Sequence, residues 1–455
     1  MTARLVIAGT ASGVGKTTVT IALMAALRAR GLIVQPFKVG PDYIDPSYHS
    51  AVAGRPARNL DSYFLPRERL LECLNRAVAG AEIAVIEGVM GLYDGRTSER
   101  DEGSTAEVAR WLDAPVVLVV DVSAMARSAA ALVRGFRDFD PTLRWAGIVL
   151  NRVGSPRHAE MVRAAIEHET GLPVLGSLPR QPEFTLPERH LGLVLASEQP
   201  LSPAWATFGE HHLDLPRILQ IATAAPPLPS PEPHLFPPRP VPPRAAIAIA
   251  QDAAFAFYYQ DTLDLLQAHG AELVPFSPLA DPALPPDASA IYLGGGYPEL
   301  HAEHLAANDT LRQAIRAAHA AGLPIYAECG GLMYLAEALE DSNGVRHPMV
   351  GLVPGVSRLQ ARPVLAYVEV TAVRPLLFAQ PGEVLRGHEF HYSTLPPPLP
   401  DQAAYRVLRP APRWEGFARP ALLASYVHLH FGVNPALAPR LVEAAAQAHQ
   451  HRTRR

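Results

Sequence analysis

The sequence predicts two α/β domains joined by a stiff linker, and three observations lead to this prediction. Over residues 1–225, short apolar, β-rich segments alternate with helix-like segments, which is typical of a doubly wound, mostly parallel sheet. The same alternation resumes in residues 244–455. Between them, residues 226–243 are rich in proline, which lacks a backbone N–H and therefore excludes a helix or a central strand.

The expected elements follow the chain in order. In the first domain, strands are expected at 5–8, 33–37, 83–87, 115–121 and 146–150, and helices at 17–30, 105–112 and 157–168. In the second, strands are expected at 245–250, 272–276, 290–293 and 324–327, and helices near 258–269 and 311–320. Alternating patterns at 364–370 and 421–428 predict a more β-rich end to this domain.

The composition argues against several classes of partner. A net charge of −4 and a pI of about 6.5, without a prominent basic patch, argue against a nucleic acid or a membrane surface. The first residues enter a strand directly, unlike a signal peptide, and no apolar run reaches the roughly 18 residues of a membrane span. The two cysteines, Cys73 and Cys329, fit a reducing compartment. We therefore expect a cytoplasmic protein.

A glycine-rich loop at residues 9–18 follows the first strand and opens a helix, which is the setting of a P-loop. Backbone N–H groups of such a loop and the helix N-terminus bind phosphate. The residues predicted to bind ATP here are Gly13, Gly15, Lys16, Thr17 and Thr18. Lys16 is expected to reach the β- and γ-phosphates, and the Thr17 hydroxyl to bind Mg²⁺. Five residues separate Gly9 from Gly15, a variant similar to the loop of dethiobiotin synthetase and partition ATPases.

Polar residues follow or end three further strands, where ligands bind in parallel sheets. Lys38 is expected to neutralise a phosphate, and the nearby Asp42 and Asp45 to coordinate Mg²⁺. Glu87 ends an apolar strand in the position of a Walker B acid, which is a further expected Mg²⁺ ligand. Asn151 ends a later strand and is expected to pair with the adenine edge. For each of these residues, a role in a turn or a helix cap is the alternative.

In the second domain, residues 323–335 predict a strand, a sharp turn and a helix, with Cys329 on the turn. The turn is expected to expose the thiol, and the helix N-terminus to lower its pKa. Gly330 leaves a backbone N–H for an oxyanion, and Gly295 and Gly296, after the preceding strand, are expected to complete the hole. A buried, inert cysteine is the alternative, but packing alone does not explain the flanking glycines.

A base for this cysteine is expected about 100 residues downstream, at the end of a β-like segment. His428 is the favoured base. His430 would share its face if the strand continues, and would then occupy the position of a third, orienting residue. His388 and His391 do not match the helical zinc pattern, because they are three residues apart rather than four. A role near an acceptor substrate and a structural role stay open for these two.

Eight motifs in order give the chain a resemblance to the cobyrinic acid a,c-diamide synthase family of corrinoid amidotransferases, over nearly its full length. They lie at residues 9–17, 37–46, 59–61, 87–95, 294–299, 328–335, 387–393 and 425–431. The resemblance implies a dethiobiotin synthetase-like P-loop domain followed by a class I glutaminase-like α/β domain. It also implies the substrates glutamine, ATP and a corrinoid, together with Mg²⁺.

The chemistry implied by the resemblance divides between the domains. Glutamine is hydrolysed at Cys329 through a thioester, with His428 as activator, and releases ammonia. ATP phosphorylates a corrinoid carboxylate, and ammonia displaces the phosphate to form a primary amide, at the a and c side chains in turn. Thr17, Asp42, Asp45 and Glu87 are implied at the ATP and Mg²⁺ site. Tyr43 and Asp94 are implied near the corrinoid.

In the usual class I glutaminase, a glutamate two residues after the histidine completes the triad. This chain departs from that pattern, because His430 stands in the position of the glutamate. We therefore expect a backbone carbonyl or a distant acid to hold His428.

Alternatives remain for the acceptor and for the class of protein. Hydrogenobyrinic acid and nickel-sirohydrochlorin would suit the same phosphate and glutamine motifs. A partition or regulatory ATPase is disfavoured because Ala11 and Ser12 stand where those proteins carry a lysine, and because it needs no second domain. An inactive scaffold is disfavoured by the intact Lys16, Cys329 and His428. The sequence does not predict an oligomeric state.

Overall fold

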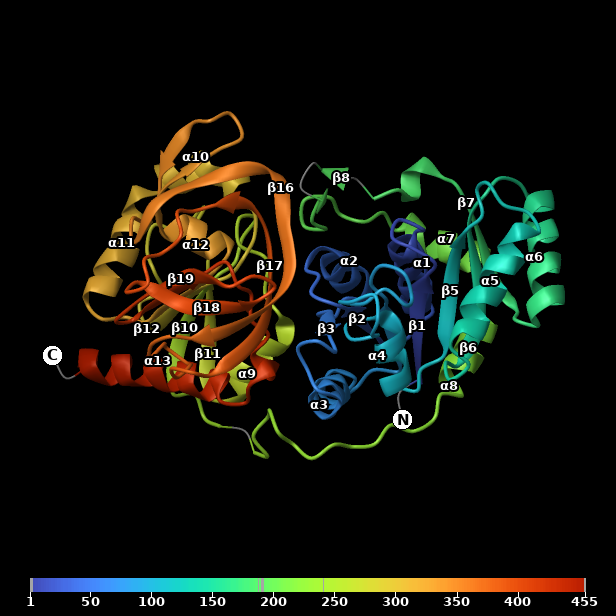
Figure 1. The fold of residues 1–455 in the computed structure, drawn as a ribbon, viewed down its shortest axis with the longest axis horizontal. Helices are drawn as coiled ribbons and strands as arrows, with labels where there is room; N and C mark the ends of the chain where they lie inside the picture. The colour runs from blue at the N-terminus through green and yellow to red at the C-terminus, as the bar shows by residue number, and fades with distance from the viewer. Residues whose placement is uncertain (1–2, 187, 190–191, 240, 454–455) are drawn as a thin grey trace. The chain divides into compact units, whose positions relative to one another are not determined.

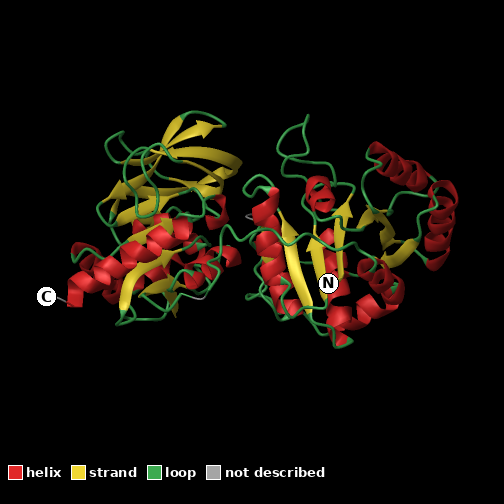
Figure 2. Ribbon diagram, turned by 90° about the horizontal axis from the view of Figure 1, so that it is seen from below, coloured by secondary structure: helices red, strands yellow, loops and turns green. Residues whose placement is uncertain are grey.

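Two sheets organise the protein in this computed structural model, which describes residues 3–186, 188–189, 192–239 and 241–453 (Figures 1 and 2). The first sheet belongs to the unit Met1–Glu232 and the second to the unit Pro233–Arg455. The division falls inside the proline-rich segment. Each unit combines a parallel set of strands with helices, so the predicted α/β fold class is confirmed.

The sheet of the N-terminal unit has the order β3-β2-β4-β1-β5-β6-β7, and its neighbouring strands are all parallel. Its strands are β1 (Ala3–Gly9), β2 (Val34–Val39), β3 (Arg58–Leu60), β4 (Ile83–Glu87), β5 (Val116–Asp121), β6 (Trp145–Val153) and β7 (Val174–Pro179). The strand order reverses around β1, and ligands bind beyond the carboxyl ends of strands at such a switch point.

Helices cover this sheet, and each element predicted within residues 5–168 coincides with an observed one. The helices are α1 (Lys16–Ala29), α2 (Ile44–Ala53), α3 (Arg67–Ala77), α4 (Thr105–Trp111), α5 (Ser128–Phe139), α6 (Pro156–Thr170), α7 (Ala204–His212) and α8 (Leu215–Thr223). A 3₁₀ turn, η1 (Pro182–Phe184), and two short strands, β8 (Glu188–Arg189) and β9 (Gly192–Leu193), follow β7. Helix α2 was not expected. It forms because Asp42 accepts hydrogen bonds from the N–H groups of Ile44 and Asp45, and because proline is tolerated in a first helical turn.

The sheet of the C-terminal unit has a parallel part and a part in which most neighbouring strands are antiparallel. Its parallel part has the order β11-β10-β12-β13-β20, and β19, β18 and β16 continue it with antiparallel pairing. The strands are β10 (Ala245–Ala250), β11 (Ala271–Phe276), β12 (Ala288–Leu293), β13 (Ile325–Glu328), β14 (Ala336–Glu340), β15 (Arg346–Pro348), β16 (Val353–Ala372), β17 (Val384–Thr394), β18 (Ala403–Arg409), β19 (Arg413–Arg419) and β20 (Leu422–Ser425). The predicted β-rich end therefore corresponds to strands β16 to β20.

The helices of this unit are α9 (Gln260–Ala268), α10 (Ala302–Ala307), α11 (Asp309–Ala320), α12 (Gly330–Leu335) and α13 (Leu437–Thr453), with 3₁₀ turns η2 (Pro298–His301) and η3 (Phe431–Val433). Among the helices that the structure describes, none has both the length and the apolar character to span a bilayer.

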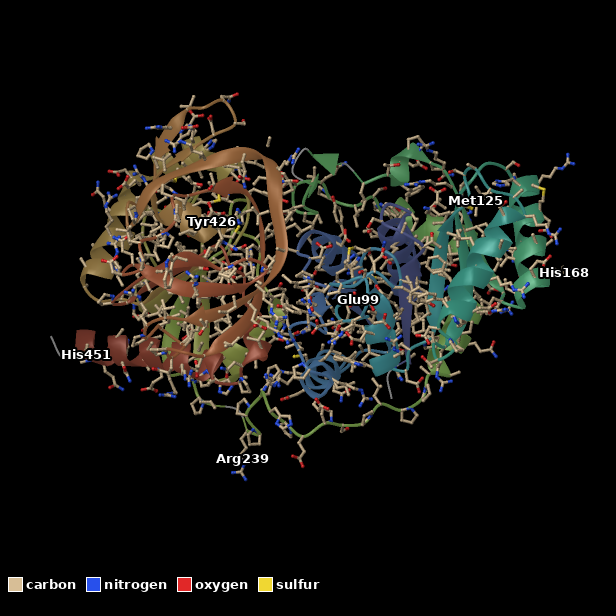
Figure 3. All side chains as sticks on the ribbon, in the orientation of Figure 1. Glu99, Met125, His168, Arg239, Tyr426 and His451 are labelled. Atoms are coloured by element: carbon tan, nitrogen blue, oxygen red, sulfur yellow. The ribbon has the colours of Figure 1, made fainter. Side chains whose placement is uncertain are left out.

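The last predicted strand, 421–428, is shorter than expected, because β20 ends at Ser425. There the Ser425 hydroxyl accepts a hydrogen bond from the Val427 N–H, and Glu415 accepts one from the Tyr426 N–H. These side-chain bonds take the place of the ladder and turn the chain. Tyr426 consequently lies among the strands of the C-terminal unit and is 8% exposed (Figure 3).

Candidate active sites

The glycine loop between β1 and α1 is held open by the end of β6. Gly13 and Gly15 have φ values of 76° and 92°, in the left-handed region that favours glycine. A Cβ on Gly15 would lie 2.0 Å from Asn151 Nδ2, so a side chain cannot fit there. The same Asn151 amide donates a hydrogen bond to the Val14 carbonyl over 2.8 Å. Asn151 therefore fixes the shape of the loop, and its contact with adenine stays a prediction.

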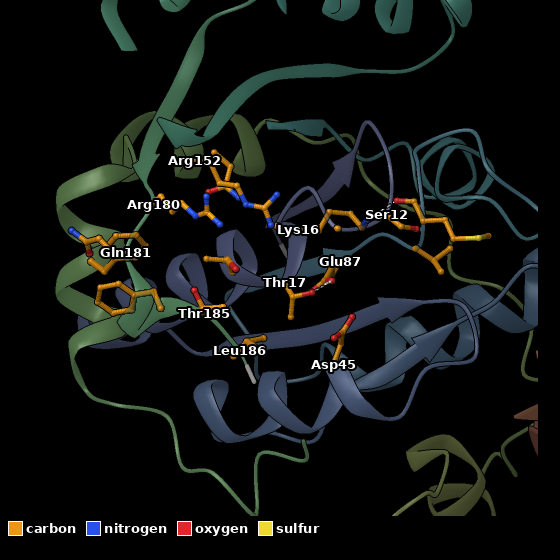
Figure 4. A pocket seen from close by; sticks show the side chains of 18 of the residues that line it. Ser12, Lys16, Thr17, Asp45, Glu87, Arg152, Arg180, Gln181, Thr185 and Leu186 are labelled. Atoms are coloured by element: carbon orange, nitrogen blue, oxygen red, sulfur yellow. Dashed lines mark hydrogen bonds between the residues drawn. The ribbon is translucent and has the colours of Figure 1, made fainter. Parts of the chain in front are cut away.

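A cleft of about 470 Å³ opens beside this loop (Figure 4). It brings together the residues predicted for ATP and Mg²⁺, namely Gly13, Gly15, Lys16, Thr17, Thr18, Lys38, Asp42, Asp45, Glu87 and Asn151. The volume lies in the range of small-molecule sites. The cleft also holds Arg152 and Arg180, which the sequence reasoning missed, although Arg152 directly follows Asn151.

Glu87 is the centre of a buried network at the floor of the cleft. Its Oε1 atom accepts hydrogen bonds from the Thr17 hydroxyl and from Lys38 Nζ, both over 2.8 Å. Its Oε2 atom accepts one from His49 Nε2 over 2.7 Å. The sequence reasoning missed His49, although it lies four residues after Asp45 on α2 and so shares the face of that helix.

Charge on Lys38 and Glu87 is favoured despite burial, whereas burial and the charge of Asp42 raise the pKa of Asp45. Burial acts against the ammonium of Lys38, but the carboxylates of Asp45 and Glu87 outweigh it and raise its pKa. Burial likewise acts to raise the pKa of Glu87, but Lys38 and His49 outweigh it and lower that pKa. Lys38 is therefore an ammonium and Glu87 a carboxylate at neutral pH.

The oxygens around Lys38 differ in their availability to a cation. Asp45 Oδ2 lies 2.5 Å from Lys38 Nζ, and Asp42 Oδ2 lies 3.7 Å from it. The other Asp42 oxygen caps α2. Glu87 Oε1 and the Thr17 hydroxyl face each other at the cleft (Figure 4). Mg²⁺ prefers such hard oxygen donors and is often held by one or two carboxylates plus phosphates, so these two residues fit it.

Lys16 lies at the mouth of the loop, where its ammonium group contacts backbone carbonyls. Its Nζ donates hydrogen bonds to the carbonyls of Ala11 over 3.1 Å and Met90 over 2.6 Å. Burial and the nearby charge of Lys38 lower the pKa of Lys16 to about 8. Neutral carbonyls compensate an ammonium only partly, so a bound anion would improve its surroundings.

Tyr43 and Asp94, which the resemblance implies near the corrinoid, do not line the cleft. Asp94 Oδ2 accepts a hydrogen bond from the Gly91 N–H over 2.9 Å and so fixes the loop after β4. Tyr43 is 7% exposed at the start of α2. Contact with a corrinoid stays a prediction for both.

In the C-terminal unit, Cys329 occupies a sharp turn between β13 and α12, as predicted. Its φ of 47° is unusual for a residue with a side chain and costs on the order of 1–3 kcal/mol. The Cys329 N–H donates to the Ser425 carbonyl over 2.7 Å, which holds the turn. A Cβ on Gly331 would lie 2.3 Å from the Leu293 carbonyl oxygen, so this turn packs directly against β12.

The expectation of an exposed thiol with a lowered pKa is wrong for this structure. Cys329 is 3% exposed, and its thiol donates to the Phe390 carbonyl over 3.5 Å. Burial raises the pKa of Cys329, the charge of Glu299 raises it further, and the Gly330 N–H lowers it only partly. Helix α12 has six residues, so it offers little dipole against this burial.

The three predicted oxyanion donors differ in whether their N–H groups are available to a ligand. The Gly295 N–H already donates to the Phe257 carbonyl over 3.2 Å, so it is not available as predicted. Gly296 and Gly330 lie against each other, because a Cβ on Gly330 would be 3.0 Å from the Gly296 nitrogen. The candidate hole is therefore formed by the backbone of Gly296 and Gly330.

His428 is completely buried, and an acid lies near it, so a role for this acid in holding His428 stays a prediction. Its Nδ1 lies 3.7 Å from Oε2 of Glu328, the residue before the cysteine. Its Cε1 lies against Gly295, where a Cβ would be 2.5 Å away. Glu328 also accepts hydrogen bonds from the Leu429 N–H over 3.0 Å and the Tyr292 hydroxyl over 3.1 Å. The sequence reasoning quoted Glu328 in a motif but gave it no role.

His430 does not support His428, contrary to the expectation. Its Nε2 lies 3.6 Å from Asp261 Oδ2, and its Nδ1 accepts the Gly432 N–H over 3.1 Å. The reason is the turn at Ser425, since the strand that would have aligned the two histidines has already ended.

The two histidines of β17 also lie in this region. The His388 ring stacks on the His428 ring with centroids 4.8 Å apart, and burial followed by the charge of His428 lowers the pKa of His388. The His391 ring stacks on Tyr426 at 3.8 Å. His391 also lines a cavity of about 20 Å³ that contains Cys329.

Comparison with known proteins agrees with this geometry. The family model described as a CobQ/CobB/MinD/ParA nucleotide binding domain matches residues 5–194. The model described as a CobB/CobQ-like glutamine amidotransferase domain matches residues 246–436. The first match contains the Lys16 and Glu87 cleft, and the second contains the Cys329 turn and His428.

Curated relatives match the chain over nearly its whole length. The cobyrinate a,c-diamide synthase of Dehalococcoides mccartyi (strain CBDB1) is 48% identical over 96% of this chain and 97% of its own. The enzymes with the same name from Salmonella typhimurium, 46% identical over 97% of both chains, and Priestia megaterium, 44% identical over 99% of this chain and 98% of its own, are similar. This protein therefore belongs to the cobyrinate a,c-diamide synthase family.

Proposed function

We propose that the chain converts the a and c carboxylates of cobyrinate to primary amides, using ATP and ammonia from glutamine. The observation that carries this proposal is the presence, in one chain of this family, of a P-loop cleft and of a second unit with a buried cysteine turn and a buried His428–Glu328 pair. A carboxylate is a poor acyl donor until its oxygen becomes a leaving group, which ATP can achieve, and the second unit supplies the nitrogen.

In the C-terminal unit, Cys329 is the nucleophile and His428 its base. The thiol proton passes to His428 as sulfur attacks the amide carbon of glutamine, and the N–H groups of Gly296 and Gly330 face the oxyanion. His428 then returns the proton to the departing nitrogen, which leaves as ammonia. Water hydrolyses the thioester and releases glutamate. Glu328 keeps the imidazole oriented and stabilises its charged form.

In the N-terminal unit, the P-loop and Lys16 bind the triphosphate. A carboxylate oxygen of the corrinoid attacks the γ-phosphorus, and ADP leaves. Ammonia then attacks the acyl carbon, and inorganic phosphate leaves. Mg²⁺, held by Thr17 and Glu87 together with phosphate oxygens, would neutralise charge on the transferred group. Asp42 and Asp45 position Lys38, and their own contact with Mg²⁺ stays a prediction.

Other readings of the chain are not favoured. The relatives carry the name of the cobyrinate enzyme, which gives no support to hydrogenobyrinic acid or nickel-sirohydrochlorin as acceptor. A partition ATPase would not need the amidotransferase domain matched at residues 246–436. A cytoplasmic location is consistent with two buried cysteines that form no disulfide.

Mass spectrometry of cobyrinic acid incubated with the protein, ATP, Mg²⁺ and glutamine labelled with ¹⁵N at its amide tests the proposal. We expect two ¹⁵N amides per product molecule. Hydrogenobyrinic acid and nickel-sirohydrochlorin serve as parallel acceptors. Amidation of one of these with no change in cobyrinic acid would contradict the assigned acceptor.

Glu328→Gln is expected to lower the glutamine-dependent kcat by at least about tenfold, because the amide cannot stabilise the His428 imidazolium as a carboxylate does. The rate with added ammonium chloride reports the N-terminal unit and should persist. Glu337→Gln, on an exposed position of β14, is the matched control. A variant with the normal glutaminase rate would show that Glu328 does not position His428.

The lowered pKa of Lys16 predicts a pH dependence of ATP binding. In the free protein Lys16 is mostly charged below about pH 8 and loses its proton above it, whereas bound phosphates favour the ammonium. ATP binding should therefore take up a proton above pH 8, and its Kd should rise by up to about tenfold per pH unit. Calorimetry in buffers of different ionisation enthalpy measures this uptake. Lys16→Arg, whose charge persists, should abolish it.

A further inference from the structure

Glu299 lies next to the candidate nucleophile without a role in the chemistry described so far. It belongs to the turn η2, directly after the glycine loop of Gly294–Gly296. With Gly296 and Tyr297 it lines the small cavity that contains Cys329. Its charge is the second cause, after burial, of the raised pKa of Cys329, so the carboxyl and the thiol influence each other directly.

The Glu299 carboxyl lacks a partner for one of its oxygens. Its Oε2 atom is shielded from solvent and accepts no hydrogen bond from any residue in the described parts of the chain. Burial raises the pKa of Glu299 to about 7. Buried polar atoms are nearly always satisfied in folded proteins, so an unsatisfied oxygen in an enzyme cavity points to a ligand that supplies the donor.

The other acidic groups that act on Cys329 are already engaged. Glu328 accepts from two tyrosine hydroxyls and lies beside His428. Glu389 is paired with Arg413. Among the three carboxylates that raise the pKa of Cys329, Glu299 is the one with an oxygen left for a ligand.

The size of the cavity limits the part of a ligand that can reach it. A volume of about 20 Å³ holds one water-sized group, and a whole amino acid does not fit. On the proposed function, the group that must approach the Cys329 sulfur is the carboxamide of glutamine. Its oxygen faces the N–H groups of Gly296 and Gly330, which leaves its NH₂ group in need of an acceptor.

We propose that Glu299 accepts a hydrogen bond from the side-chain NH₂ of glutamine and thereby selects glutamine over glutamate. This rests on the proposed function and adds the specificity of its glutaminase site. Glutamate would place a carboxylate oxygen against the Glu299 carboxyl, and the two repel each other unless one is protonated, so this discrimination against glutamate is strongest above about pH 7, where Glu299 is charged. The same repulsion helps the product glutamate to leave after hydrolysis of the thioester.

The test compares wild type with Glu299→Gln on two substrates. With glutamine, kcat/KM should fall about 5- to 10-fold, because the amide oxygen of the variant still accepts the NH₂ hydrogen bond but is a weaker, uncharged acceptor. With the γ-methyl ester of glutamate, which has no N–H on its leaving group, kcat/KM should change less than about threefold. Glutamate should inhibit the variant more strongly than the wild type. Rates are divided by the ammonia-dependent rate of the same sample, which measures folded enzyme.

Glu303→Gln, an exposed position on the neighbouring helix α10, removes a charge outside the cavity and is the matched control. An unchanged kcat/KM for glutamine in Glu299→Gln would overturn the proposal. An equal fall for glutamine and the ester would also overturn it, because a merely structural role affects both. A separate experiment tests the proposed function itself. If glutamine-dependent amidation persisted in Cys329→Ala, the proposed function would fail independently of the role of Glu299.

Discussion

Replacing Cys329 with alanine is expected to lower glutamine-dependent amidation by at least about a thousandfold, while amidation with ammonium chloride continues. Sulfur forms the thioester in the proposed mechanism, and alanine cannot. The phosphorylated corrinoid forms in the other unit, so it still reacts with ammonia supplied from solution. Labelled product is counted by mass spectrometry with each nitrogen source.

Cys73→Ala is the matched control, because Cys73 is also a buried cysteine outside any disulfide but lies on α3 of the N-terminal unit. It should keep both activities at a somewhat lower Tm, since the change removes one buried sulfur. Glutamine-dependent product from Cys329→Ala at the normal rate would mean that another group attacks glutamine.

Lys16→Met is expected to lower the rate of amidation about a thousandfold with either nitrogen source. The hydrolysis of glutamine to glutamate should continue. The ammonium is the charge of the P-loop that reaches the β- and γ-phosphates, and methionine keeps the length of the side chain without that charge. Product formation with ammonia and glutamate release from glutamine are measured on the same samples. The two readings separate the ATP site from the glutaminase site.

The control for this variant is Arg30→Met, which removes a positive charge from the other end of α1. Arg30 is paired with Glu210 at the surface, and exposed pairs of this kind contribute little to stability. Its activity should match that of the wild type. Normal ammonia-dependent amidation by Lys16→Met would place the phosphates of ATP elsewhere.

Local sequence was sufficient to predict the phosphate loop and the cysteine turn. Each motif consists of a strand, a glycine-containing turn and a helix start within about ten residues. One short segment of sequence therefore determines its geometry. The N-terminal strands were predictable for the same reason, because buried parallel strands are continuous apolar runs.

Contacts between segments that are distant along the chain were not predictable in this way. His49 meets Glu87 only when α2 packs on the sheet, and Glu328 meets His428 across 100 residues of sequence. Burial of the Cys329 thiol depends on Phe390 in β17, a strand that no local feature of the cysteine turn indicates. The error over His430 came from a turn fixed by Glu415, a residue of another strand.

The proline-rich segment makes contacts with both units. Arg4 donates to the Pro226 carbonyl and Asn75 to the Pro229 carbonyl, whereas Leu235 is 2% exposed in the C-terminal unit and its carbonyl contacts His269 Nε2. From Pro229 to Leu235 the chain makes six Cα–Cα steps (235 − 229), which span at most about 20 Å. A tether of this length holds the two units at an effective concentration in the millimolar range, whatever the protein concentration in the cell. Ammonia production and its consumption therefore stay coupled at high dilution, where two separate proteins of modest affinity would drift apart.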